Sequence, residues 1–365
     1  MLDKYKTTTK LSTQLFNYCF MKKVLFLMAV ILGGLTAFAQ NLDKNEAKQL
    51  QAFVAANASA LKASDPKAIA SVEGVTVDNG HVTAIDWKDK KLTGSLNLTG
   101  FKALTKVDVS RNELTSLNVA GCANLTELNA SRNKLAEINL DGCSNLQTLT
   151  IYKNRLADID LANVPMLKKL NLSNNLFVEL SLQNSTTLET LNCQGCHLES
   201  LNVSGCTGLK NLYCGYNKLT SVTLTGVENL QNLNVDDNEI SNLIISGLPS
   251  LTTLICSDNN MVTLGVRDCN ALIDVVCSYN DLTNFTVDGC PNLQYVDCSY
   301  NDLTQLSLPN QTFLQRIICN NNQLTMLDVS FDQALTYINC RFNQITDFRT
   351  IACNNLRMVA CQWNF

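Results

Sequence analysis

Residues 251–292 read LTTLICSDNNMVTLGVRDCNA-LIDVVCSYNDLTNFTVDGCPN, in which one 21-residue pattern occurs twice. The same spacing places a leucine every 21 residues without a slip, thirteen times from Leu104 to Leu356. A strict repeat of this length is one supersecondary unit copied many times, and each unit buries its apolar face only against its neighbours. The sequence therefore predicts one continuous solenoid rather than two or three globular domains.

Each copy, here called a turn, is numbered from its leucine as position 1. Positions 4, 11, 14 and 16 are almost always aliphatic or Phe, so we expect them to line the interior. Position 9 is Asn in twelve of the thirteen turns. A short amide can donate to and accept from backbone groups that face inward, so these residues should form a buried ladder. They are Asn112, Asn133, Asn154, Asn175, Asn217, Asn238, Asn259, Asn280, Asn301, Asn322, Asn343 and Asn364.

The pattern L-x-x-L-x-[L/C]-x-x-N-x-L resembles that of the leucine-rich repeat family over residues 104–365. A looser, atypical copy precedes it, with Val82, Ile85, Trp87 and Leu92 at positions 1, 4, 6 and 11 and Lys90 in place of Asn. The repeat length and the frequent Cys at position 6 are most similar to the cysteine-ladder branch of internalin-type bacterial surface proteins. This resemblance implies a mostly β solenoid of the α/β repeat type, a right-handed coil whose concave parallel sheet has one short strand per turn and binds ligands. The sequence departs from the family's pattern in two respects: we find no LPxTG-like anchoring motif, and we expect no separate domain after the repeats.

The region before the repeats predicts export and a cap. Residues 21–39, MKKVLFLMAVILGGLTAFA, combine two lysines, an apolar run and an Ala-x-Ala ending, as in a secretory signal peptide. From Asp43 to Ala63 apolar residues recur at helical spacing, with Asp43 as N-cap, and such a helix would cover the first open coil. We expect a leader and signal in residues 1–39 (the signal proper from Met21 to Ala39), a helical cap in residues 40–81 and the solenoid in residues 82–365. The mature chain should have no transmembrane span and should be secreted, periplasmic or on a bacterial cell surface.

The sequence contains no corresponding cap at the other end. It stops at Phe365, position 10 of turn 13, which leaves half a coil. Either further chain follows in the natural protein, or another molecule covers the last strand. Self-association through this coil is one of the alternatives.

Fifteen cysteines remain if Cys19 is removed with the signal, and in an exported chain they first suggest disulfides. The repeat register favours core positions instead, because eight cysteines occupy position 6 and six occupy position 19. Neighbouring parallel strands lie ~4.8 Å apart, whereas a disulfide requires β-carbons ~3.8 Å apart. We therefore expect mostly reduced, buried thiols.

One cluster, Cys193-Gln194-Gly195-Cys196-His197, matches the C-x-x-C-H signature of c-type haem attachment. In register, however, Cys193 is position 6 and Cys196 replaces the ladder asparagine. Both side chains should then point into a close-packed core with no room for a porphyrin. We interpret the motif as a substituted ladder position rather than a haem, redox or metal site.

Composition and motifs argue against other classes of function. The net charge of −4 and the absence of a basic run disfavour nucleic acid as a partner. Only His81 and His197 are present, and no P-loop, nucleophile elbow or zinc-protease motif occurs. We expect no enzymatic activity, no cofactor and no metal site.

The outward face of the predicted sheet is the candidate binding site. Alternation in the strand places positions 3, 5 and 7 outward, with positions 2 and 8 beside them. This face is polar in the first turns, whereas aromatic and apolar residues gather on it from turn 8 onward. The candidate ligand-binding residues are Ile255, Val276, Tyr279, Tyr295, Asp297, Tyr300, Arg316, Ile318, Tyr337, Arg341, Phe342 and Trp363. High β-propensity alone is the alternative explanation for these residue types.

Three functions are consistent with the predicted solenoid and its outward face. The first is a protein-binding or adhesion module that uses the concave sheet. The second is a glycan-binding surface protein, in which the same aromatics stack on sugar rings. The third is a structural envelope or coat component, which needs no distinctive patch.

Overall fold

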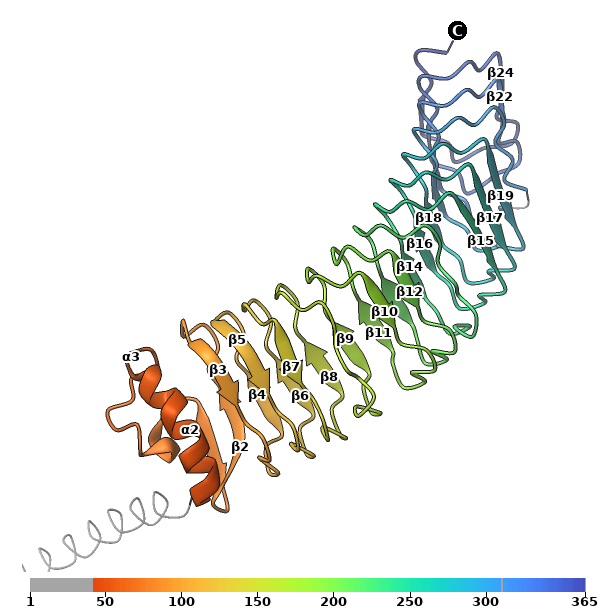
Figure 1. The fold of residues 1–365 in the computed structure, drawn as a ribbon. Helices are drawn as coiled ribbons and strands as arrows, with labels where there is room; N and C mark the ends of the chain where they lie inside the picture. Colours follow the sequence, from red (N-terminus) through yellow and green to blue (C-terminus); the bar gives the residue numbers. More distant parts are fainter. Residues whose placement is uncertain (1–41, 310, 365) are drawn as a thin grey trace, which may run out of the picture. The chain divides into compact units, whose positions relative to one another are not determined.

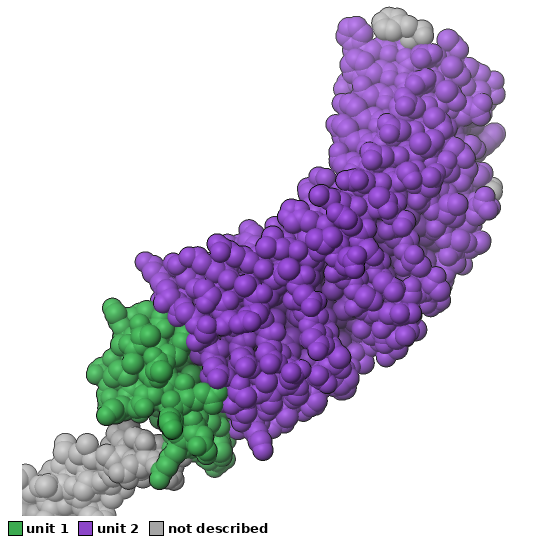
Figure 2. Space-filling view, in the orientation of Figure 1, with its two compact units in different colours: residues 1–87 green, residues 88–365 purple. Residues whose placement is uncertain are grey.

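The computed structural model describes residues 42–309 and 311–364. The predicted leader, the signal peptide and Phe365 lie outside these residues. The chain forms two compact units that divide after Trp87, shown in green and purple in Figure 2. Within the described residues, no helix is both long enough and apolar enough to span a bilayer.

The first unit contains the predicted helix. Helix α2 (Lys44–Ala56) begins at Asp43, whose Oδ1 accepts hydrogen bonds from the backbone N–H groups of Asn45 (2.8 Å) and Glu46 (3.1 Å). These bonds satisfy two N–H groups at the start of the helix. A short helix α3 (Ala58–Leu61), a 3₁₀ turn (Ile69–Ser71) and the antiparallel hairpin of β1 (Val75–Asp78) and β2 (His81–Asp86) complete the unit. The hairpin includes Val82 and Ile85 of the atypical first repeat.

The second unit is a mostly β solenoid of about 13 turns, in which successive turns stack one on the next (Figure 1). Positions 3–5 of every turn form a short strand, and these strands make one parallel main sheet with each residue paired to the residue 21 positions later, as in Leu254↔Val275. The strands are β4 (Lys106–Asp108), β6 (Glu127–Asn129), β8 (Thr148–Thr150), β9 (Lys169–Asn171), β11 (Thr190–Asn192), β13 (Asn211–Tyr213), β14 (Asn232–Asn234), β16 (Thr253–Ile255), β18 (Asp274–Val276), β20 (Tyr295–Asp297), β21 (Arg316–Ile318), β23 (Tyr337–Asn339) and β25 (Met358–Ala360).

A second set of strands corrects the expectation of one strand per turn. Most turns form another strand around positions 13–15, because the apolar residues at positions 14 and 16 alternate with polar ones and fit a half-buried strand. These strands make four short parallel groups, and among the described residues turns 3, 6 and 10 contribute none. They are β3 (Thr93–Asn97), β5 (Glu113–Asn118), β7 (Glu137–Asn139), β10 (Glu179–Ser181), β12 (Ser200–Asn202), β15 (Asn242–Ser246), β17 (Thr263–Arg267), β19 (Asn284–Asp288), β22 (Met326–Asp328) and β24 (Asp347–Arg349).

The interior is filled by the repeat positions that the pattern marks as apolar. Every position-1 leucine from Leu104 to Leu335 is buried, and only Leu356 of the last turn is partly exposed. Burial of a leucine side chain contributes about 1.5–3 kcal/mol. Because each turn supplies the same set, the core is a column that continues from turn to turn.

The asparagines at position 9 connect successive turns. The Asn259 amide donates to the carbonyls of Val235 in the preceding turn (3.0 Å) and Ser257 in its own turn (3.0 Å), and its Oδ1 accepts from the N–H of Ile240 (3.0 Å). The bond to the preceding turn's position-6 carbonyl recurs from Asn133 to Asn364. Each amide thus provides partners for buried backbone groups of two turns.

Candidate binding face on the main sheet

The strands fix which positions face outward. Position 4 is fully buried in turns 8 to 12, whereas positions 3 and 5 are partly exposed there. Position 7 faces outward as expected only at the end of the solenoid: Ser257, Ser278 and Ser299 are buried, whereas Arg341 in turn 12 is exposed. The chain turns inward after the strand, and in turn 10 the side chain of Asp297 accepts from both the N–H (3.0 Å) and the hydroxyl (2.6 Å) of Ser299. The candidate binding face therefore consists of positions 3, 5 and 8, with position 7 added in turns 12 and 13.

Position 8 has a left-handed backbone in every turn, with φ between +50° and +67°. For an L-residue other than glycine this conformation costs roughly 1–2 kcal/mol, and glycine or asparagine tolerates it best. Turn 5 has Gly195 there and turns 4 and 11 have asparagine, but five turns carry an aromatic residue. These residues are Tyr216, Tyr279, Tyr300, Phe342 and Trp363. Bulky aromatic side chains are uncommon at such left-handed positions.

Four of these aromatics form two stacked pairs. The rings of Tyr279 and Tyr300 lie 4.3 Å apart and are nearly parallel, at 9°. Those of Phe342 and Trp363 lie 5.9 Å apart at 3°. The exposed fractions are 51% and 43% for the tyrosines, and 49% and 59% for Phe342 and Trp363. Large apolar rings that stay half in solvent are typical of interaction surfaces.

A row of three residues lies beside the pairs at position 3. Tyr295, Arg316 and Tyr337 are in register on β20, β21 and β23. The guanidinium carbon of Arg316 lies 5.6 Å from the ring centre of Tyr295 and 5.0 Å from that of Tyr337, which is cation–π geometry. Burial raises the pKa of Tyr295, and the nearby Asp297 carboxylate adds to the effect.

Position 5 changes chemistry along the same face. In turns 1, 2, 4, 5 and 7 an Asp or Asn there accepts a bond from the N–H of position 7, as Asp108 does from Ser110 (2.9 Å). Turns 8, 9 and 11 replace this residue with the partly exposed Ile255, Val276 and Ile318. These turns give up a local hydrogen bond and present apolar side chains instead.

All twelve predicted site residues lie on β16 to β25 or in the turn that follows a strand. The structure brings the four position-8 aromatics into pairs and Arg316 between two tyrosines. Asp297 lies on the face, but its bonds to Ser299 and to the Tyr295 hydroxyl (3.4 Å) give it a structural role. Arg341 is exposed and donates to the side chain of Gln362. Apart from the glycine and the asparagines that occur there, no residue indicates the left-handed backbone at position 8.

The cysteines lie in the core. Thirteen of the fifteen described are buried, and only Cys353 and Cys361 are not. In the C-x-x-C-H motif, Cys193 and Cys196 are fully buried, and the Cys196 thiol donates to the Leu172 carbonyl (3.2 Å), as a ladder asparagine would. Burial raises the pKa of Cys196 to about 11 and that of Cys214 to about 12, so these thiols are protonated at neutral pH. No group of three or more potential metal ligands occurs among the described residues.

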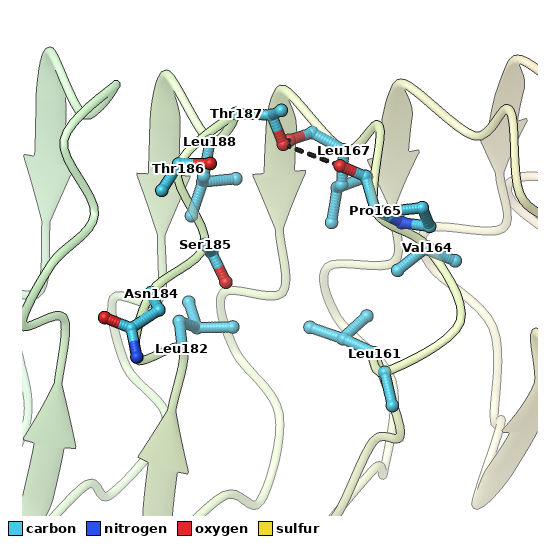
Figure 3. Close-up of a pocket in the computed structure, with 11 residues that line it drawn as sticks. Leu161, Val164, Pro165, Leu167, Leu182, Asn184, Ser185, Thr186, Thr187 and Leu188 are labelled. Carbon is cyan, nitrogen blue, oxygen red and sulfur yellow. Dashed lines mark hydrogen bonds between the residues drawn. The ribbon is translucent and has the colours of Figure 1, made fainter.

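Two cavities that the sequence did not indicate lie at gaps between the groups of second strands. One, of about 310 Å³, opens between turns 3 and 4, where Leu161, Leu182 and the Ser185 hydroxyl point into it (Figure 3). The other, of about 570 Å³, opens between turns 10 and 11 beside Leu306 and Phe331. Among the described residues, no strands of the second set pair across these gaps, and at the first gap the Thr187 hydroxyl of turn 4 donates to the Pro165 carbonyl of turn 3 (2.9 Å). Asp328 and Asp332 line the second cavity, where burial and then the charge of Asp328 raise the pKa of Asp332 to about 6.

Solved structures share the solenoid fold of this chain. The functional domain of InlJ from Listeria monocytogenes, which includes a cysteine ladder, is 25% identical, with a TM-score of 0.54 over 80% of this chain and 74% of that one. The protein has a leucine-rich repeat fold. The leucine-rich repeat protein LIC12759 of Leptospira interrogans is 23% identical, with a TM-score of 0.53 over 67% of this chain and 74% of that one. The HAESA leucine-rich repeat ectodomain of Arabidopsis is 21% identical, with a TM-score of 0.50 over 76% of this chain and 56% of that one.

These likenesses confirm the predicted leucine-rich repeat solenoid and its similarity to cysteine-ladder internalin-type proteins. No family model matches the chain. No curated protein sequence matches it either.

Proposed function

We propose that this protein is an exported leucine-rich repeat module that binds a protein partner through the main-sheet face of turns 8 to 13. The observation that carries the proposal is the row of exposed, stacked aromatics at strained left-handed positions. High β-propensity does not account for them, because left-handed residues lie outside the strands. Large rings flanked by an arginine match the composition of interface hot spots.

The proposal extends to export and to the class of ligand. The signal-like segment at residues 21–39 supports secretion or display on a bacterial surface. The HAESA ectodomain structure is a complex with a peptide hormone, which shows that this fold can present a protein-ligand site. The absence of a recognised catalytic motif supports binding rather than catalysis.

The test compares two matched variants of the full chain. Tyr279→Asn/Tyr300→Asn removes the stacked pair and leaves at position 8 a residue that turns 4 and 11 already contain. Tyr216→Asn makes the same change at a position-8 tyrosine in turn 6. A partner captured by the wild type and identified should bind the double variant at least about tenfold more weakly by biolayer interferometry, and Tyr216→Asn should bind normally.

Equal affinity for all three proteins would contradict the site. Circular dichroism checks that each variant is folded. A glycan array run in parallel distinguishes the second candidate, because stacked aromatics are also suited to sugar rings. Glycan binding that requires Tyr279 and Tyr300, without a protein partner, would replace the protein-binding proposal.

A further inference from the structure

The two halves of the solenoid differ in charge. Residues 88–229 contain fourteen Lys and Arg against twelve Asp and Glu, whereas residues 230–365 contain five arginines against thirteen acidic residues. No lysine occurs after Lys218. The aromatic half is therefore strongly acidic, and its field attracts cations.

Acidic residues precede the tyrosine pair along position 8. Successive turns place Asp237 and Asp258 at position 8 immediately before Tyr279 and Tyr300, and backbone bonds join these turns in sequence. The N–H of Asp258 donates to the Ser278 carbonyl (3.0 Å), and that of Tyr279 donates to the Ser299 carbonyl (3.1 Å). Position 8 thus forms one row in which two carboxylates precede two rings.

Two more carboxylates lie at position 10. Asp281 and Asp302 are exposed and each follows a stacked tyrosine by two residues. Desolvation and then the neighbouring Tyr300 hydroxyl raise the pKa of Tyr279, and the carboxylates of Asp258 and Asp297 add to the effect. An aromatic platform with carboxylates nearby in the same turns and in the preceding turn is complementary to a cationic side chain.

The same face already contains one example of this recognition. The Arg316 guanidinium of this protein lies between the rings of Tyr295 in the preceding turn and Tyr337 in the following turn. Tyr279 and Tyr300 stack on each other instead, and about half of each ring is exposed. Their geometry would let a guanidinium or ammonium group of another molecule rest on the rings and reach the carboxylates beside them.

We propose that Tyr279 and Tyr300, with Asp258, Asp281 and Asp302, bind an arginine- or lysine-rich segment of a partner protein. This inference rests on the proposed function and specifies the chemistry of the partner. The rings supply cation–π contacts, and the carboxylates supply charge-assisted hydrogen bonds. Binding should weaken as salt rises, because exposed charges are screened.

The experiment measures fluorescence anisotropy of labelled nona-arginine, nona-lysine and nona-glutamate peptides with the full chain. The two cationic peptides should bind and nona-glutamate should not. Tyr279→Asn/Tyr300→Asn should weaken cationic binding at least about fivefold. The triple variant Asp258→Asn/Asp281→Asn/Asp302→Asn should weaken it similarly and flatten its salt dependence, whereas Tyr216→Asn should leave it unchanged.

Three outcomes would overturn the inference. The first is equal cationic binding by the wild type and both site variants, which indicates diffuse charge attraction. The second is failure of the cationic peptides to bind the wild type while an identified partner still requires the tyrosine pair, in which case the proposed function stands and its partner is not cationic. The third is dimerisation of the wild type, lost in the double variant, which identifies a second copy of this chain as the occupant.

Discussion

Turns 1 to 6 and turns 8 to 13 share one backbone but present different chemistry on the main sheet. In the early turns, ion pairs join neighbouring turns, as Lys106 does with Glu127 (2.7 Å) and Lys210 with Glu189 (3.0 Å). In turns 8 to 13, the ion pairs of the described residues all involve Arg349 and lie on β22 and β24, away from this sheet. Ion pairs between turns are part of the early face, whereas the late face exposes rings and carboxylates.

This difference separates the residues that the fold requires from those that it does not. The ladder asparagines, the leucines and the left-handed position 8 are the same in both halves, so the scaffold does not require the aromatic residues. What differs are positions 3, 5 and 8, which the scaffold leaves open. The two halves should therefore respond alike to changes at scaffold positions and differently to changes at positions 3, 5 and 8.

The largest effect is expected from breaking the ladder. Asn154→Ala in turn 3 and Asn259→Ala in turn 8 each remove bonds to two turns and leave a buried N–H, of Leu135 or of Ile240, without its acceptor. Each should lower the free energy of unfolding by about 2–3 kcal/mol in urea titrations. Asn259→Cys, which copies turn 5, should cost less. Very different losses at the two sites would show that the scaffolds are not equivalent.

The next effect concerns position 5. Val276→Asn should give the N–H of Ser278 the acceptor that Ser110 has in turn 1, and should raise the free energy of unfolding by about 0.5–1 kcal/mol. The reverse change, Asp108→Val, should lower it by about the same amount. Denaturant titration of both variants checks this pair. If Val276→Asn destabilises the protein, the apolar residue is needed for folding rather than for a surface.

A smaller effect is expected at position 8. Arg111 has a left-handed backbone (φ 57°), so Arg111→Gly should stabilise the protein by up to about 1 kcal/mol. Tyr279→Gly should gain less, because it also loses the stacked contact with Tyr300. Thermal unfolding compares the two. A larger gain for Tyr279→Gly would mean that stacking contributes nothing to the fold.

The smallest effect is a pH dependence at position 19, where Asp332 replaces the cysteine of other turns. Burial, and then the charge of Asp328, raise the pKa of Asp332 to about 6, above the ~3.9 of an unfolded chain. The folded state therefore binds the proton more tightly, and stability should fall as pH rises from about 4 to about 6. Asp332→Asn should remove this component and raise Tm at pH 7 by about 1–2 °C. An unchanged difference between Tm at pH 4.5 and at pH 7 in the variant would refute this assignment.

Much of the scaffold could be predicted from residue spacing. The 21-residue period placed the leucines, all position-6 cysteines but Cys361, and the ladder asparagines in the interior, and helical spacing after Asp43 predicted the N-terminal helix. The 21-residue period also gathered Tyr279, Tyr300 and their neighbours onto one face, because residues at one repeat position must align when turns stack. The binding role of that face stays a prediction.

Other features could not be predicted from residue spacing, because they depend on how each turn of the solenoid closes. The inward direction of Ser257 at position 7, the second strands such as β15, and the cavities at turns 3–4 and 10–11 follow from how the chain returns to the next coil. The left-handed backbone of position 8 is imposed by hydrogen bonds between turns, such as that from the N–H of Tyr279 to the carbonyl of Ser299. Position 8 is occupied by residue types as different as Arg111 and Trp363, so residue type alone could not indicate its left-handed conformation. Sequence determined which side chains share a row, and only the tertiary structure decided which rows are strained, paired and exposed, because backbone closure sets φ and side-chain direction at each position.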